Sequence, residues 1–192
     1  MKKKRDLPET SQPLLSRWLF VLIGNNDSGK TSFQRHLISY LCDLTYVKLR
    51  CDKVFEVRHP RAPRNFATIF CANRSYQEKR DENGTVENYV TSVVCDADVT
   101  IVATHAGIND MQDVQDLLRF GRRSGYNVAA VFFENALTSI TTDISELDWQ
   151  ERLLIRNSIV RAGDQQQEKI QEQLWLAAVQ FGDLLIARTA YY

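Results

Sequence analysis

The feature that most constrains this chain is the eight-residue segment 24–31, which reads GNNDSGKT. It fits the pattern G-x-x-x-x-G-K-[ST], in which a glycine-rich loop surrounds the phosphates of a nucleotide. The mostly apolar run 17–23 before it predicts a buried parallel strand. After it, apolar residues recur at helical spacing at Phe33, Leu37, Ile38 and Leu41. The chain therefore has strand, loop and helix in the order that phosphate binding requires.

Each residue type in this loop has a physical role. Gly24 and Gly29 permit backbone conformations and close approaches that a Cβ atom would obstruct. Successive N–H groups at the positive end of a helix dipole bind anions. Lys30 adds charge at the β- and γ-phosphates, and the Thr31 hydroxyl is placed to ligate Mg²⁺. We therefore expect ATP or GTP with Mg²⁺ as cofactors, although a glycine turn before an ordinary helix would have the same spacing. The predicted nucleotide contacts are Gly24, Asn25, Asn26, Asp27, Ser28, Gly29, Lys30, Thr31 and Ser32.

Composition narrows the class of protein. The chain has 192 residues, of which 44% are hydrophobic and 25% are charged. This length and composition predict one globular domain over 17–192, and the segment 1–16 before it is predicted to be a mobile basic tail. Lys+Arg and Asp+Glu both number 24, so net charge does not indicate nucleic acid as a partner. No apolar run approaches the ~20 residues that span a bilayer, and no apolar signal-peptide region follows the basic start. We expect a cytoplasmic protein without a membrane partner.

The four cysteines do not suggest a metal or disulfide framework. Cys42, Cys51, Cys71 and Cys95 are widely spaced, without a C-x-x-C pair, and the three histidines do not complete a zinc-binding pattern. Reduced and mostly buried thiols are the expectation.

Strand and helix patterns alternate along the rest of the chain. Strands are predicted at 44–51, 65–72, 98–105, 127–133 and 183–190. Helices are predicted at 86–95, from 111 to an end within 122–125, around Trp149 to Leu154 after a capping box at 145–148, and from an Asp164 cap to Gly182. The polar stretch 75–84 reads as an exposed loop. This alternation predicts an α/β fold, a three-layer α/β/α sandwich with a mostly parallel five- or six-stranded sheet.

Two predicted strand ends carry candidate site residues. Asp52 follows the second strand at the edge where α/β proteins bind ligands, so it is a candidate general base; capping the next helix is the alternative. Thr104 and His105 end the strand at 98–105. Many proteins with a phosphate-binding loop of this kind, a P-loop (here the segment 24–31), have at that point an acid that holds Mg²⁺ through water. His105 is a candidate for sensing the γ-phosphate or orienting a water, and a purely structural histidine is the alternative.

Two groups of arginines are candidate anion contacts. Arg58, Arg61 and Arg64 lie in a loop stiffened by two prolines and suit a phosphate or carboxylate of a substrate; a solvated basic turn is the alternative. Arg152 and Arg156 would stand on one face of the predicted helix, where they would close over phosphates or pair with nearby acids.

The loop and the alternating pattern resemble the P-loop NTPase superfamily. More finely, the P-loop, a strand followed by Asp52, the strand from Asp98 to Thr104 and the approach to a strand at 125–128 look like polynucleotide-kinase-like and zeta-toxin-like small kinases. That resemblance implies Asp52 as catalytic base and Arg152 or Arg156 as phosphate clamps. The chain departs from it at Val102, where an acid is usual, and over 61–84, which has no counterpart.

The function expected first is therefore a small phosphotransferase. It would bind a nucleoside triphosphate with Mg²⁺ through Lys30 and the rest of the loop, and would transfer phosphate to a small-molecule or nucleotide acceptor beside Asp52. The alternatives are a nucleotide-dependent switch or assembly ATPase or GTPase with slow hydrolysis and a protein partner, or a domain that binds nucleotide without catalysis.

Overall fold

The computed structural model describes residues 17–45, 49, 53–72, 74–93, 96–159 and 166–189. The strands in this part of the chain are β1 (Trp18–Ile23), β2 (Val54–Glu56), β3 (Thr68–Cys71), β4 (Val99–Thr104), β5 (Asn127–Phe133) and β6 (Glu151–Ile155). The helices are α1 (Lys30–Cys42), α2 (Arg80–Asn83), α3 (Val86–Val93), α4 (Met111–Arg123), α5 (Ser139–Ser145) and α6 (Gln167–Thr189). Three single-turn 3₁₀ helices join them: η1 (Gln77–Lys79), η2 (Ile108–Asp110) and η3 (Glu134–Ala136).

Within the described residues the strands form one six-stranded sheet in the order β2-β3-β4-β1-β5-β6. All neighbours are parallel except β2, which runs antiparallel to β3. The chain leaves β1 for the β2 edge, returns to β4 beside β1, and then continues on the other side with β5. The carboxyl end of β1 is therefore a topological switch point, where open α/β sheets bind their ligands.

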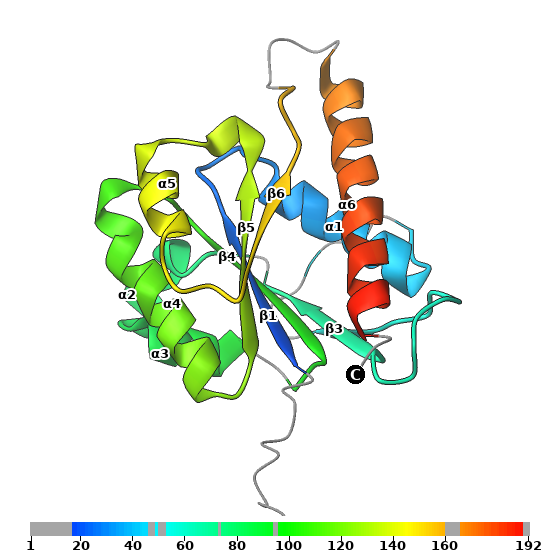
Figure 1. Ribbon diagram of the computed structural model, residues 1–192, viewed down its shortest axis with the longest axis horizontal. Helices are drawn as coiled ribbons and strands as arrows, with labels where there is room; N and C mark the ends of the chain where they lie inside the picture. The colour runs from blue at the N-terminus through cyan, green and yellow to red at the C-terminus, as the bar shows by residue number, and fades with distance from the viewer. Residues whose placement is uncertain are drawn as a thin grey trace, which may run out of the picture.

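Helices cover both faces of the sheet, with α1 and α6 on one side and α3, α4 and α5 on the other (Figure 1). Alternate residues of β1 serve the two cores. Phe20 packs toward α1 and α6, where the Phe181 ring meets the rings of Phe20 and Phe33 at centroid distances of 5.1 and 5.5 Å. Val21 points into the opposite core, beside α3 and α4. The three-layer sandwich with a mostly parallel sheet is thus confirmed.

Most of the predicted elements between the P-loop and β5 are present. The helix after the loop, the strands at 98–105 and 127–133, and the helices starting near 86 and 111 are all confirmed within a few residues. The strand predicted at 65–72 is confirmed as the shorter β3.

The predicted second strand at 44–51 is wrong where it can be compared with the structure. Leu44, Thr45 and Leu49 lie outside the strands, and the other residues of that range, like Asp52 after it, lie outside the described residues. The structure instead has β2, an edge strand of the sheet that pairs antiparallel with β3. Three residues are too few to show a period-two pattern in the sequence.

The helix predicted around Trp149 to Leu154 is also wrong, because this segment forms the edge strand β6. Leu153 and Ile155 pack into the core beside α1 and α6, whereas Leu154 points the other way and is exposed. That alternation is the period of a strand. A short apolar run such as 153–155 does not by itself distinguish a strand from a helix.

The segment 183–189, where a final strand is predicted, is helical. Gly182 does not end the last helix: α6 continues to Thr189, with Phe181 and Leu185 buried four residues apart. A Cβ atom on Gly182 would lie 2.7 Å from the Tyr40 ring, so the glycine lets α1 pack closely on α6. The predicted Asp164 cap lies outside the described residues. The stretch 75–84 is not a loop either, since it contains η1 and α2.

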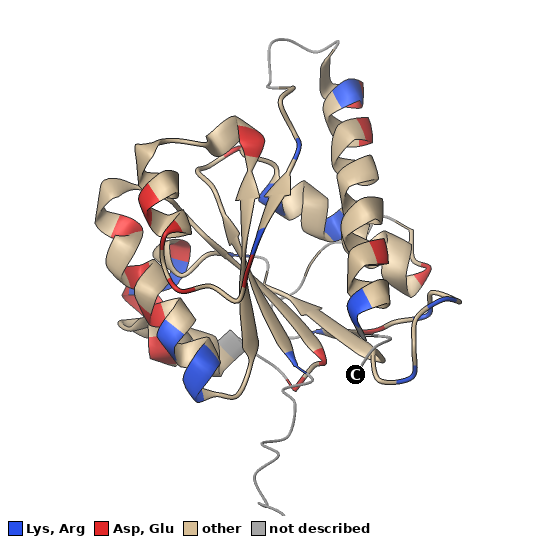
Figure 2. Ribbon diagram, viewed as in Figure 1, with Lys and Arg blue, Asp and Glu red and all other residues tan. Residues whose placement is uncertain are grey.

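Charged side chains lie mainly on the helices and loops around the sheet, with both signs interspersed (Figure 2). The three central strands β1, β4 and β5 contain no Lys, Arg, Asp or Glu. Among the described helices, none is both long enough and apolar enough to cross a membrane.

Candidate phosphate-binding site

A cavity of about 800 Å³ lies at the carboxyl ends of the central strands. The P-loop forms its floor, the region of η1 and β4 one wall, and the segments after β5 and β6 together with α6 the other. Its lining residues outside the P-loop are Ser32, Glu78, His105, Asn135, Ala136, Leu137, Thr138, Asn157, Ile159, Gln167, Ile170, Gln171, Gln173 and Leu174.

The P-loop has the tight geometry expected from its glycines. Gly29 is the N-cap of α1 and has φ of 95°, in the left-handed region that disfavours side chains, and Asp27 also has positive φ. Gly24 is needed for close packing, because a Cβ atom there would lie 2.8 Å from Ser28 Oγ. The Gly24 N–H donates to the Thr104 carbonyl, which fixes the loop's start to the end of β4.

Backbone N–H groups of the loop remain available to a ligand. The N–H groups of Gly29, Lys30 and Thr31 have no hydrogen-bond acceptor among the described residues. The first N–H groups of a helix lack partners within it and carry the positive end of its dipole. An anion seated here would satisfy these donors without any movement of the fold.

Lys30 folds back over this loop. Its Nζ donates to the carbonyl oxygens of Gly24 and Asn25, the latter at 2.8 Å, and lies 3.3 Å from Ser28 Oγ. Burial lowers the pKa of Lys30 to about 8, partly opposed by the nearby carboxylates of Glu78 and Asp27. A partly desolvated ammonium with only neutral acceptors gains strongly from a phosphate.

The Thr31 side chain fits the predicted role toward Mg²⁺. It lines the cavity and is exposed, and no hydrogen bond occupies its hydroxyl among the described residues. In that same part of the chain, no three His, Cys, Asp or Glu side chains gather closely enough to hold a metal ion. Mg²⁺ prefers oxygen ligands and commonly rests on one or two protein groups plus substrate phosphates, and Thr31 suits that mode.

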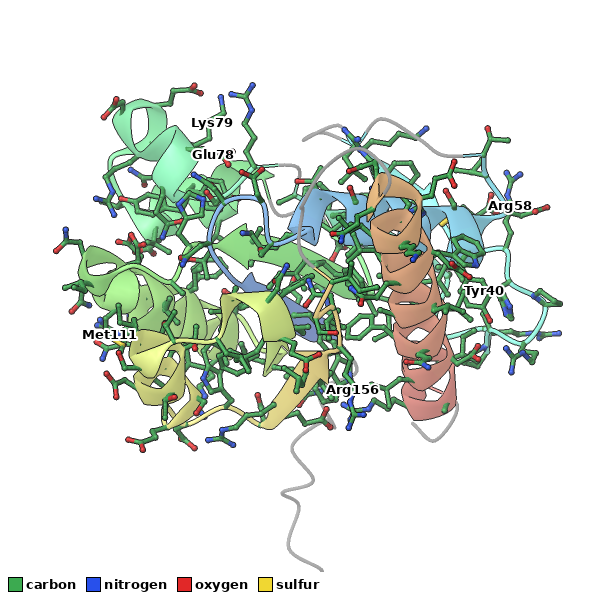
Figure 3. The ribbon with its side chains drawn as sticks, turned by 90° about the horizontal axis from the view of Figure 1, so that it is seen from above. Tyr40, Arg58, Glu78, Lys79, Met111 and Arg156 are labelled. Atoms are coloured by element: carbon green, nitrogen blue, oxygen red, sulfur yellow. The ribbon has the colours of Figure 1, made fainter. Side chains whose placement is uncertain are left out.

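Glu78 is a cavity-lining residue that the sequence interpretation missed. It lies on η1, lines the cavity, and its Oε1 is 3.9 Å from His105 Nε2 (Figure 3 labels Glu78). Because 75–84 is almost entirely polar, it was predicted to be a solvated loop. The available signal was position: this segment follows β3, and so begins at the ligand-binding edge of the sheet.

A side-chain network holds η1 in place. Gln77 donates to Thr104 Oγ1 at 2.9 Å and to Asp113 at 3.1 Å, and its own oxygen accepts from the His105 N–H. Arg80 forms an ion pair with the same Asp113. The position of Glu78 is therefore coupled to the end of β4 and to α4.

His105 forms part of the cavity wall. Its Nε2 lies 3.4 Å from Ser75 Oγ, and the ring is partly buried. Burial, assisted by the Lys30 charge, lowers the pKa of His105 below its usual value. The imidazole is therefore neutral at pH 7 and would contact a ligand through a hydrogen bond rather than through charge.

The described arginines among the predicted site residues lie away from the cavity. Arg58 pairs with Glu56 and lies on the opposite side of the molecule from Glu78 (Figure 3). Arg61 contacts Tyr40 and Asp183, and Arg64 is exposed on the same loop. The structure therefore does not bring this basic loop together with the P-loop.

Arg152 and Arg156 do not cover the phosphate end either. Arg152 donates to the carbonyl oxygens of Ser145 and Leu147 and so binds the C-terminal end of α5. Arg156 is exposed beside a separate groove of about 270 Å³ between β6 and α6. The predicted pairing of Arg152 with acids is replaced by hydrogen bonds to backbone, because β6 directs its side chain toward α5.

Comparison with known proteins adds no family. The chain has no significant match to a family model, to a curated protein or to a solved structure. Any functional conclusion therefore depends on the chemistry of the cavity.

Proposed function

We propose that this chain is a P-loop protein that binds a nucleoside triphosphate with Mg²⁺ and hydrolyses it slowly. One observation carries the proposal: at a topological switch point of the sheet, one cavity is lined by the partly buried Lys30 ammonium and by residues at the N-terminus of α1 whose N–H groups have no acceptor in the described part of the chain. Backbone donors, a fixed cation and a helix dipole together form a site for a polyphosphate.

The cavity also has room for a nucleoside. Beyond the loop, its wall combines apolar side chains with amides and a hydroxyl, supplied by η3, the segment after β6 and the first half of α6. Ligand cavities of about 300–1,000 Å³ with apolar walls and a few polar groups are typical of small-molecule sites. This end suits a base and ribose, with the phosphates lying on the loop.

Glu78 is the residue proposed to assist hydrolysis. Its carboxylate faces the cavity near enough to Lys30 to affect the pKa of that lysine, and the neutral His105 lies beside it. A carboxylate in this position would accept a proton from the attacking water or orient it. Phosphoryl transfer otherwise depends on positioning and on charge stabilisation.

Slow hydrolysis is favoured over efficient phosphotransfer because the expected arginine clamp is elsewhere. An arginine that reaches the transferring phosphate accounts for about 10³–10⁵ in rate in related chemistry. In the described part of the chain, Lys30 is the only Lys or Arg that lines the cavity. The nucleotide-dependent switch, with a protein as partner, is therefore preferred here to the kinase.

Calorimetric titration of the protein with ATP and with GTP in the presence of Mg²⁺ tests the proposal. We expect binding of one of them, and Lys30→Ala should weaken it about 10- to 100-fold, because hydrogen bonds to charged groups contribute roughly 1.5–3 kcal/mol. Thr142→Ala, a change on α5 outside the cavity lining, is the matched control. Equal affinity in the parent protein and Lys30→Ala, or no binding of either nucleotide, contradicts the proposal.

A further inference from the structure

Asn157 joins the P-loop to a strand at the far side of the site. Its side chain is 2% exposed and lies just beyond the end of β6. Its Nδ2 donates to the Ser28 carbonyl oxygen at 2.8 Å in a buried hydrogen bond, and its Oδ1 accepts from the Asn135 N–H at 3.4 Å. Both ends of the amide are therefore engaged, one with the P-loop and one with η3.

This hydrogen bond fixes the direction of one peptide unit. A trans peptide is planar, so the C=O of Ser28 and the N–H of Gly29 point in opposite directions. Asn157 holds the carbonyl on its own buried side, and the Gly29 N–H is consequently turned the other way. That N–H has no acceptor among the described residues, and Gly29 lines the cavity.

Glycine makes this restraint necessary. Gly29 has φ of 95°, and a residue without Cβ can rotate its flanking peptide units more freely than any other. The opposite orientation of the Ser28–Gly29 unit would direct a carbonyl oxygen toward the ligand and repel a phosphate. A buried amide whose two ends are both bonded is a rigid means of preventing this.

We propose that Asn157 is a positioning residue for phosphate binding, which keeps the Gly29 N–H directed into the cavity by holding the Ser28 carbonyl. The identity of the ligand in this statement rests on the proposed function. Because the same amide accepts from Asn135, the orientation of the phosphate cradle is set jointly with the segment after β5, at the nucleoside end of the cavity.

The decisive variant is Asn157→Asp. The carboxylate keeps the shape of the side chain and the acceptor for the Asn135 N–H, but it cannot donate to the Ser28 carbonyl oxygen. The Ser28–Gly29 peptide unit therefore loses its restraint, and its carbonyl oxygen is repelled by the carboxylate oxygen that replaces Nδ2. Asn157→Ala is a second variant should the buried carboxylate prevent folding. Ser158→Ala changes the exposed neighbour and is the matched control.

Two readouts separate positioning from mere support. In isotopically labelled protein without ligand, the residual dipolar coupling of the Gly29 N–H reports the direction of that bond. We expect it to change in both Asn157 variants and to stay constant in Ser158→Ala. Affinity for Mg²⁺-pyrophosphate, measured by calorimetry, should fall about 10- to 100-fold in the Asn157 variants, the loss expected for one donor to a charged group.

The outcomes are distinct. An unchanged Gly29 coupling in a folded Asn157 variant, or a changed coupling with unchanged pyrophosphate affinity, overturns the positioning role. If the parent protein binds neither pyrophosphate nor ATP or GTP, the proposed function fails, while the coupling measured without ligand still decides whether Asn157 orients Gly29. A lower melting temperature with the parent's Gly29 coupling shows a structural role only, and also overturns the proposal.

Discussion

The Lys30 ammonium donates to the Asn25 carbonyl at 2.8 Å, so this side chain folds back over the loop that precedes its own helix. Neutral carbonyl oxygens compensate poorly for the lost hydration of a charge, and burial accordingly lowers the pKa of Lys30 to about 8. A phosphate in the cavity would provide a charged acceptor and would raise that pKa again. Ligand binding and protonation of Lys30 are therefore linked.

The first prediction follows from this linkage. Without ligand, Lys30 is about half deprotonated at pH 8 and mostly deprotonated at pH 9, so binding of Mg²⁺-nucleotide at these pH values should take up protons. At pH 6.5 the lysine is already charged and contributes no uptake. Calorimetry at each pH in two buffers of different ionisation enthalpy measures the proton count. Lys30→Met should abolish the difference between pH 6.5 and 8.5, and an equal difference in both proteins would contradict the assignment.

The same pKa has a consequence for stability. The charged form is penalised in the folded state, so the unfolded state binds more protons between pH 8 and 10.5, and the contribution of Lys30 to the free energy of unfolding rises over that interval. A difference of about 2.5 pKa units corresponds to about 3 kcal/mol. Urea denaturation at pH 7.5 and 10 should show the parent protein gaining stability relative to Lys30→Met.

The second prediction concerns Arg152 and Arg156, which from the sequence would either close over phosphates as a lid or pair with nearby acids. Arg152 donates to carbonyl oxygens at the C-terminal end of α5, where a cation is favourable. Arg152→Gln should therefore lower the free energy of unfolding by about 1 kcal/mol without changing nucleotide affinity. Arg156→Gln, at an exposed position, should change neither quantity. A loss of nucleotide affinity in either variant, measured by calorimetry, would instead support a contact between that arginine and the phosphates.

These arginines illustrate where sequence patterns stop being informative. The short apolar run 153–155 fits a strand as well as a buried helix, and only its pairing with β5 shows that it is a strand. The long strands β1, β4 and β5 were predictable because they are buried on both faces and read as continuous apolar runs. The short β2 depends on its antiparallel partner and leaves no local pattern.

The third prediction tests the close packing of α1 on α6. Gly182→Ala places a Cβ atom 2.7 and 2.9 Å from two Tyr40 ring carbons, and the ring is held by a 2.5 Å hydrogen bond to Asp183. Overpacking costs about 1–3 kcal/mol, which should exceed the gain of up to about 1 kcal/mol for alanine over glycine in a helix. Thermal unfolding should therefore show net destabilisation.

The matched background is Tyr40→Ala. With the ring removed, Gly182→Ala should become neutral or stabilising, because only the helix preference remains. A double-mutant cycle gives the coupling between the two positions. If Gly182→Ala costs the same in both backgrounds, the glycine serves some purpose other than accommodating Tyr40.

The candidate site could be proposed from the sequence only where its chemistry is contained in one continuous segment. The P-loop carries its own backbone donors, cation and hydroxyl between Gly24 and Thr31, so its spacing was sufficient. Glu78 and Asn157 reach the same cavity from segments that follow β3 and β6, 47 or more residues farther along the chain than Thr31. Polar residues in such segments are indistinguishable from solvated ones until the sheet order brings strand ends together.

The last prediction separates hydrolysis from phosphotransfer. Asp52 is the base expected for a kinase and lies outside the described residues, whereas Glu78 faces the cavity. A positioned general base contributes about 10²- to 10⁴-fold. If Glu78 assists the attack of water, Glu78→Gln should reduce nucleotide hydrolysis by a factor in that range and leave binding intact, while Asp52→Asn should change hydrolysis little. The measurement is release of radiolabelled phosphate, together with a screen for transfer to nucleosides, nucleotides, sugars and nucleic-acid ends. Transfer to an acceptor that collapses in Asp52→Asn but persists in Glu78→Gln would instead establish a kinase, with Asp52 as its base.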